Sequence, residues 1–169
     1  LSPSTPVVLR WESPAGLVFR RTVEVDDRFM FTVTQSVENT GDTEHRLAPY
    51  GLVARHGEPQ DLSGFFIIHE GAIQRTDGIS ELNGYNDIPD LDTPEEFASW
   101  GANASVQQAE SSGWVGFTDH YWMTTLIPEQ GQPFTSVVQY IQREDVYRAA
   151  ARMPTVTVEP GGAQDITTQ

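Results

Sequence analysis

Residues 113–128, GWVGFTDHYWMTTLIP, have the highest density of aromatic side chains in the sequence and decide its fold. Residues 114–117 predict a short apolar strand, and residues 118–119 are typical of a turn. Residues 121–127 are bulky or β-branched, which indicates a second strand that is buried on at least one face. Pro128 then ends this strand.

The aromatic residues of this stretch favour core packing over a ligand platform. A buried aromatic side chain removes roughly 150–250 Å² from water, so four of them can supply much of a small core. We therefore expect Trp114 and one of Tyr121 or Trp122 to lie in the core. Burial of Trp114 and Trp122 would count against a carbohydrate-binding surface.

The rest of the chain is dominated by alternation of apolar and polar residues, the pattern of β-strands. It is clearest over residues 28–38, where Phe29, Phe31 and Val33 share one face. Residues 39–42, Asn-Thr-Gly-Asp, predict a hairpin turn into the next strand. Further strands are expected at residues 7–11, 17–25, 46–56, 65–69, 71–73, 79–82, 134–141, 155–159 and 163–168.

Helix is expected in one place at most within the irregular residues 83–108. Thr93 resembles an N-cap and Pro94 a first helical residue, with Phe97 and Trp100 as hydrophobic anchors. Residues 142–152 are ambiguous between helix and strand. The sequence therefore predicts an all-β fold of about ten or more strands with at most one or two short helices.

Two parts of the sequence resemble a known family. Gly113-Trp114-Val115, the aromatic pair Tyr121-Trp122 and the closing Ile127-Pro128 resemble the signature of the large periplasmic domain of YidC-type membrane protein insertases. Near the N-terminus, Trp11, Gly16 and Val37-Glu38-Asn39 resemble the same domain in order and spacing. The resemblance spans nearly the whole chain and is weakest at residues 85–108.

The resemblance implies an antiparallel β-supersandwich like that of galactose mutarotases, made of two large packed sheets. It also favours a strand at residues 146–151 within the ambiguous segment. On this basis residues 1–169 are expected to form a single β-sandwich domain, a fragment of the large periplasmic domain that is truncated at both ends.

The composition limits the possible partners. Residues 1–169 contain 24 acidic and 10 basic side chains, for a net charge of −14, and every basic residue is Arg. Such a charge repels nucleic acid and anionic lipid headgroups and leaves cationic partners possible. The sequence has no Cys, which excludes disulfides and thiolate chemistry, and no stretch approaches the roughly 20 apolar residues of a membrane span.

No catalytic, cofactor or metal site is predicted. His45, His56, His69 and His120 are scattered without metal-binding spacing, and Asp119-His120 is not accompanied by a Gly-x-Ser-x-Gly nucleophile motif. Residues 87–96 are acidic but lack the spacing of a calcium loop. A sugar epimerase needs a carboxylate opposite a His; the candidates are Glu38 and Glu70, with His69 or His56 as partners.

The resemblance implies the periplasmic part of a bacterial inner-membrane protein that aids insertion and folding of other inner-membrane proteins. The implied partners are the Sec translocon, its accessory subunits and nascent membrane proteins, without nucleic acid. Membrane contact would come only through transmembrane helices absent from this chain. The expected role is docking or scaffolding without catalysis. The alternatives are a mutarotase-like sugar epimerase and a carbohydrate-binding β-sandwich.

Overall fold

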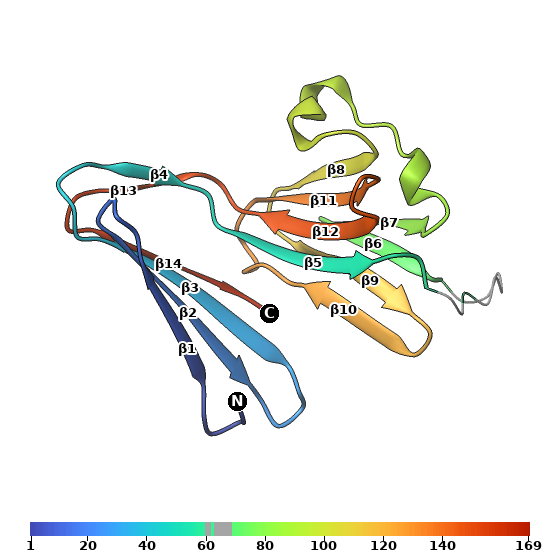
Figure 1. The fold of residues 1–169 in the computed structure, drawn as a ribbon. Helices are drawn as coiled ribbons and strands as arrows, with labels where there is room; N and C mark the ends of the chain where they lie inside the picture. The colour runs from blue at the N-terminus through green and yellow to red at the C-terminus, as the bar shows by residue number, and fades with distance from the viewer. Residues whose placement is uncertain (60–61, 63–68) are drawn as a thin grey trace. The chain divides into compact units, whose positions relative to one another are not determined.

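The computed structural model describes residues 1–59, 62 and 69–169 (Figure 1). All of its strand pairs are antiparallel, and the helical elements in these residues are two short 3-10 helices, η1 (Ile88–Asp90) and η2 (Glu95–Trp100). The predicted all-β antiparallel sandwich is confirmed. The strand expected at residues 65–69 lies almost entirely outside the described residues.

The chain divides into two compact units, and each is described by itself. Unit 1 contains residues 1–49 and 153–169, and unit 2 contains residues 50–152. The expectation that residues 1–169 form one sandwich domain stays a prediction.

Unit 1 is built on one four-stranded sheet with a small second sheet. The large sheet has the strand order β1-β2-β3-β14. The small sheet pairs β13 with β4. The bounds are β1 (Val7–Glu12), β2 (Leu17–Val25), β3 (Phe31–Asn39), β4 (His45–Leu47), β13 (Val156–Val158) and β14 (Ala163–Thr168).

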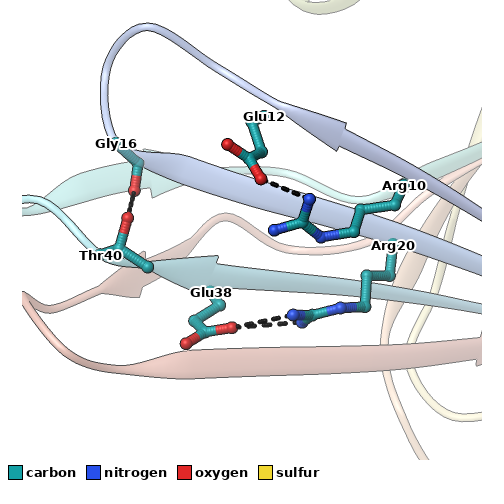
Figure 2. A network of polar contacts seen from close by, with 6 residues as sticks. All are labelled: Arg10, Glu12, Gly16, Arg20, Glu38 and Thr40. Carbon is teal, nitrogen blue, oxygen red and sulfur yellow. Dashed lines mark hydrogen bonds and ion pairs between the residues drawn. The ribbon is translucent and has the colours of Figure 1, made fainter.

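The central strands of unit 1 are also linked through their side chains (Figure 2). Arg20 on β2 donates two hydrogen bonds of 3.2 Å to Oε2 of Glu38 on β3. At the end of this strand pair, the Thr40 hydroxyl donates to the Gly16 carbonyl oxygen at 2.8 Å. Gly16 has a φ of 79°, and a Cβ there would lie 2.9 Å from the backbone of Gly41. Only glycine fits this close approach without strain.

Asn39 connects the separate parts of unit 1. Its side chain is fully buried, and its Nδ2 donates to the carbonyl oxygens of Thr43 at 2.7 Å and Val158 at 3.0 Å. Its Oδ1 accepts from the Gly41 N–H at 3.0 Å, and its backbone N–H donates to Gly162 at 2.9 Å. The side-chain amide therefore fixes the end of β3 to β13, which explains an Asn at the end of the predicted strand, and the backbone N–H fixes it to the β13–β14 turn.

Three predictions that involve unit 1 need correction. The turn at residues 39–42 does not close a hairpin, because β3 pairs with β2 and β14 while β4 pairs with β13. The strand expected at residues 28–38 begins only at Phe31, because Asp26 Oδ1 accepts from the N–H groups of Arg28 and Met30 and closes a turn. Phe29 lies in that turn with a φ of 63°. The strand expected at residues 46–56 is split into β4 and a second strand from residue 50, since Pro49 cannot donate a ladder hydrogen bond.

Unit 2 is a two-layer sandwich. One sheet has the strand order β10-β9-β6-β7 and the other β5-β12-β11-β8. The strand expected at residues 146–151 is confirmed as part of β12. The bounds are β5 (Tyr50–His56), β6 (Gly71–Thr76), β7 (Ile79–Gly84), β8 (Ala104–Ala109), β9 (Gly113–Asp119), β10 (Trp122–Leu126), β11 (Phe134–Ile141) and β12 (Val146–Arg152).

The core of unit 2 lies between these sheets. The first sheet contributes Ala72, Val115 and Phe117. Tyr85, which follows β7, enters the same core, with its ring centroid 5.8 Å from that of Phe117 and 5.0 Å from that of Tyr147. The remaining buried members are Ile88, Ala109, Phe134, Val138, Ala149 and Ala151.

The aromatic residues expected in the core are not there. Val115 and Phe117 point inward on β9, so Trp114 lies on the opposite face and is only half-buried. Tyr121 is 93% exposed and Trp122 is 78% exposed at the end of the β9–β10 hairpin. The prediction that Trp114 and one of the other two lie in the core is therefore wrong. Core aromatics come instead from several separate elements.

The helix expected at residues 93–100 is a 3-10 helix. The N-cap of η2 is Pro94 rather than Thr93, and no side-chain cap is present. The Thr93 hydroxyl accepts instead from the N–H of Ala104 at 3.0 Å, which ties this segment to the start of β8. Phe97 and Trp100 are half-buried, so η2 has no fully buried anchor.

Asp77 organises the connection between β8 and β9. Its carboxylate accepts backbone hydrogen bonds from Glu110 at 2.6 Å and from Ser111 and Ser112 at 3.0 Å each. The hydrogen bond from the Glu110 N–H is the largest cause that holds the pKa of Asp77 below its ordinary value of 3.8, and the bonds from Ser111 and Ser112 add to it.

We expect Asn39→Ala to lower the free energy of unfolding by about 2–4 kcal/mol, because it leaves buried carbonyl and N–H groups without partners. Urea denaturation followed by circular dichroism measures the change. Asp42→Ala, in the exposed turn beside it, is the control and is expected to stay within about 0.5 kcal/mol. Equal effects of the two substitutions would show that Asn39 does not hold unit 1 together.

The Asp77 carboxylate should make stability depend on acid. Its folded-state pKa is lowered, so its contribution is present above the unfolded-state pKa and is lost as the pH falls through the folded-state value. We expect Asp77→Asn to lower the urea midpoint at pH 7 and to differ progressively less from the unsubstituted chain below about pH 4. A difference that is the same at pH 7 and in acid would exclude the carboxylate charge as its origin.

We expect Phe117→Ala to cost about 3–5 kcal/mol of stability, since it opens a cavity between the two sheets of unit 2. Trp122→Ala removes a larger side chain and is expected to change stability by less than about 0.5 kcal/mol, because that side chain is exposed. Both values come from urea unfolding. A loss from Trp122→Ala as large as that from Phe117→Ala would place the hairpin tip in the core.

Candidate functional site

The tip of the β9–β10 hairpin presents large apolar side chains to solvent. Asp119 pairs with Trp122, so only His120 and Tyr121 connect the strands, and the turn lies two residues later than predicted. Tyr121 has a φ of 69°, an uncommon conformation for a bulky residue. Tyr121, Trp122 and Met123, which we call the aromatic tip, are all exposed. Single exposed apolar residues are ordinary, but three in a row at a turn indicate a contact surface.

A salt bridge attaches the base of this hairpin to the opposing sheet. Asp119 follows Val115 and Phe117 on the inward face of β9, and its Oδ2 lies 2.5 Å from Nη1 of Arg55 on β5. Both side chains are about one-third exposed or less. A partly screened pair of this kind adds modest stability, but it fixes the direction in which the hairpin leaves the sandwich.

Tyr85 closes the core beneath this salt bridge. Its side chain is 1% exposed, and Cζ of Arg55 lies 5.8 Å from its ring centroid. Burial, reinforced by the neighbouring Asp119 carboxylate, raises the pKa of Tyr85 well above its ordinary value of 10. The phenol therefore stays protonated at neutral pH and cannot serve there as a general base.

A contact between a carboxylate and a histidine holds the turn itself. Nδ1 of His120 contacts Oε1 of Glu70, and the Glu70 side chain is only 8% exposed. The His120 ring also meets the edge of Tyr121, with 5.5 Å between ring centroids. Thr118 adds a hydrogen bond of 3.0 Å from its hydroxyl to the His69 carbonyl oxygen. The base of the hairpin is thus anchored while the aromatic tip is exposed, which favours binding because the backbone that carries the tip needs little further ordering.

The structure separates the acid–base pairs suggested by the sequence. Glu38 forms an ion pair with Arg20 in unit 1 (Figure 2). The network drawn there includes no His. Glu70 meets His120 instead of His69 or His56. The His69 ring lies 3.0 Å from the Ala72 carbonyl oxygen, a contact that holds the chain just before β6.

Arg55 and Tyr85 were not predicted as site residues. A usable signal was present for Arg55, since Val53 and Arg55 share the inward face of β5, where a charge needs a partner. Asp119 occupies the corresponding inward position on β9. Nothing in the local sequence indicates that Tyr85 would enter the core from a turn.

In residues 1–59, 62 and 69–169 there is no group of three or more His, Asp or Glu side chains positioned to hold a metal ion. The acidic side chains at Asp87, Asp90 and Asp92 are exposed around η1. None of the helices in the described part of the chain has the length and apolar character needed to cross a lipid bilayer.

Comparison with known proteins agrees with the resemblance seen in the hairpin sequence. The family model described as the YidC periplasmic domain matches residues 1–169. The membrane protein insertase YidC of Jannaschia sp. (strain CCS1) is 55% identical over 170 residues, covering 100% of this chain and 26% of that protein. The protein of the same name from Dinoroseobacter shibae is 56% identical over 162 residues, covering 96% of this chain and 26% of that protein.

A third relative, the membrane protein insertase YidC of Paracoccus denitrificans, is 50% identical over 162 residues, covering 95% of this chain and 25% of that protein. The chain spans about a quarter of the length of these curated relatives. With the family model matched from end to end, the chain belongs to the family of YidC periplasmic domains.

Proposed function

We propose that this chain is the periplasmic docking module of a membrane protein insertase in a bacterial inner membrane. In this role it aids the insertion and folding of inner-membrane proteins by holding partners or substrate segments close to the insertion site. The proposal draws on relatives named membrane protein insertase, of which this chain corresponds to about a quarter. It assigns no catalysis to the domain.

The observation that carries the docking role is the aromatic tip. Tyr121 and Trp122 are the most conspicuous exposed residues of unit 2, and they belong to the part of the sequence that most resembles the family. Tyr and Trp are enriched where proteins bind one another, because they combine a large apolar surface with a polar group. The salt bridge between Arg55 and Asp119 and the contact between Glu70 and His120 hold the residues next to the tip.

The proposed partners are the Sec translocon, its accessory subunits and nascent inner-membrane proteins. The net charge of −14 disfavours nucleic acid and favours partner surfaces that are neutral or basic. Interfaces of modest area are sufficient for contacts of this kind between domains of one membrane assembly.

The two alternative functions are not favoured. Glu70 and His120 do form a carboxylate–His pair, but the two side chains contact each other and Glu70 is nearly inaccessible. The exposure of Trp122 leaves a carbohydrate platform physically conceivable on that residue alone. Membership in the YidC periplasmic domain family disfavours both the sugar epimerase and the carbohydrate-binding sandwich.

Deletion of the domain from the full-length insertase tests the docking role. Removing the segment equivalent to residues 1–169, with the membrane part retained, is expected to leave insertion of simple substrates largely intact. Crosslinking to accessory subunits of the translocon should weaken, because the docking surface is gone. Both are measured in inner-membrane vesicles by protease protection of the substrate and by crosslink yield.

Loss of insertion from a membrane part that remains folded and abundant would show that the domain does more than dock partners. A finer variant replaces Tyr121, Trp122 and Met123 with Ala and is expected to lower the crosslink yield as the deletion does. Its control, Phe29→Ala, removes an aromatic side chain that is 82% exposed in a turn of unit 1 and should leave the yield unchanged.

A further inference from the structure

The strand β10 is an open edge of its sheet. Within the described residues it pairs only with β9, so its other side presents unpaired backbone N–H and C=O groups. Its sequence, Trp-Met-Thr-Thr-Leu, contains neither a charged residue nor Pro. Soluble proteins usually protect such edges with one of these features, because an unprotected edge accepts a further strand.

The other edges of the three four-stranded sheets in the described part of the chain are protected. Each of four carries at least one charged or ionisable side chain: Arg10 and Glu12 on β1, Asp165 on β14, Glu81 on β7, and Arg55 and His56 on β5. The fifth, β8, lacks a charge, but Ser105 and Gln107 donate hydrogen bonds of 2.9 and 2.6 Å to Glu81. These side-chain hydrogen bonds link the edge strands β8 and β7, whereas the edge of β10 has no such link in the described residues.

The open strand is also held in place at both ends. At its start, Asp119 and His120 are fixed by Arg55 and Glu70. Towards its end, the Leu126 side chain packs on Gly51 of β5, where an added Cβ would lie only 3.2 Å from a Leu126 methyl group. A rigid, extended strand with free backbone groups is prepared for strand addition without prior rearrangement.

We propose that the outer edge of β10 binds an extended, uncharged apolar peptide segment with basic flanks as an additional strand. This inference rests on the proposed function and names the class of substrate segment: an unfolded stretch of a membrane protein rich in Val, Thr and Leu. Main-chain hydrogen bonds to β10 give the affinity. Trp122 and Met123, which alternate along the strand, contact the peptide's side chains.

Charge selects this occupant over two others. The uncharged edge accommodates an uncharged peptide centre, while the field of a domain with net charge −14 attracts basic flanks. The same field repels a second copy of the chain, which would also carry −14, and repels anionic lipid headgroups.

The test uses the 169-residue chain and a fluorescent peptide of nine alternating Val and Thr residues with two Lys at each end. We expect saturable binding by fluorescence anisotropy. A matched peptide with alternate backbone nitrogens methylated keeps its side chains but loses the donors of one edge. It should bind about tenfold more weakly or worse, because each lost hydrogen bond lowers the affinity. Equal binding of both peptides would overturn strand addition.

Two matched substitutions locate the site. Met123 on β10 is 52% exposed and Leu82 on β7 is 53% exposed, and both lie on edge strands of the same sheet. We expect Met123→Lys to weaken peptide binding by about tenfold, through charge on the edge, and Leu82→Lys to leave it unchanged. Thr124→Lys is the second β10 variant if Met123→Lys unfolds, as judged by the urea midpoint. Equal losses from β7 and β10 variants would overturn the assignment.

Three further measurements separate other occupants. Sedimentation of the chain with vesicles of zwitterionic lipid, abolished by Met123→Lys, would assign the edge to a lipid surface and overturn the proposal. Dimerisation abolished by the same substitution would assign it to a second copy. Failure of the full-length insertase to bind the peptide would show that another segment of the same protein covers β10. Each outcome leaves the deletion experiment free to support or refute the docking role by itself.

Discussion

The inward face of β9 is the constraint on which the structure of unit 2 depends. A strand buried on one face must send alternate residues into the core, and on β9 these are Val115, Phe117 and Asp119. The first two make the apolar centre of the sandwich. The third brings a carboxylate to its end, and Arg55 and Tyr85 are arranged around that charge. The same alternation turns Trp114 outward and leaves the aromatic tip beyond the core, so one register decides both packing and the exposed surface.

Unit 1 is held by different means. Its main sheet has few buried apolar side chains, among them Leu17 and Val18. The buried Asn39 does part of the work that a larger core does elsewhere, with bonds to the loop after β3 and to β13. A polar group that satisfies its hydrogen bonds in this way specifies one arrangement of the backbone, since any slip leaves donors or acceptors unpaired. The cross-strand pair of Arg20 and Glu38 supplements this on the exposed side.

Much of the fold followed from the sequence, because period-2 alternation and turn residues are local signals. The strands around residues 31–38, 134–141 and 163–168 were found in this way. The errors arose where tertiary contacts override local pattern. Asp26 and its backbone bonds delay β3, and Pro49 divides a predicted strand. The aromatic content of residues 113–128 suggested that Trp122 is buried. Its burial depends instead on its position relative to the two-residue turn, which aromatic content does not reveal. Of the candidate site, Asp119, His120 and Glu70 were noticed, but Glu70 was assigned to the wrong His, and Arg55 was missed because it is far from Asp119 in sequence.

The bonds of Asn39 have a consequence for the order in which the chain can fold. Asn39 lies near the start of the chain, and its partners Val158, Gly161 and Gly162 lie near the end. All of residues 50–152 are synthesised between them, so unit 2 is complete before unit 1 has its last strand. Contacts of such long sequence separation form slowly, because the intervening loop must close first. If that loop is already a folded sandwich, its ends are held close together, and unit 2 then serves as a template that shortens the search for the closing strand of unit 1.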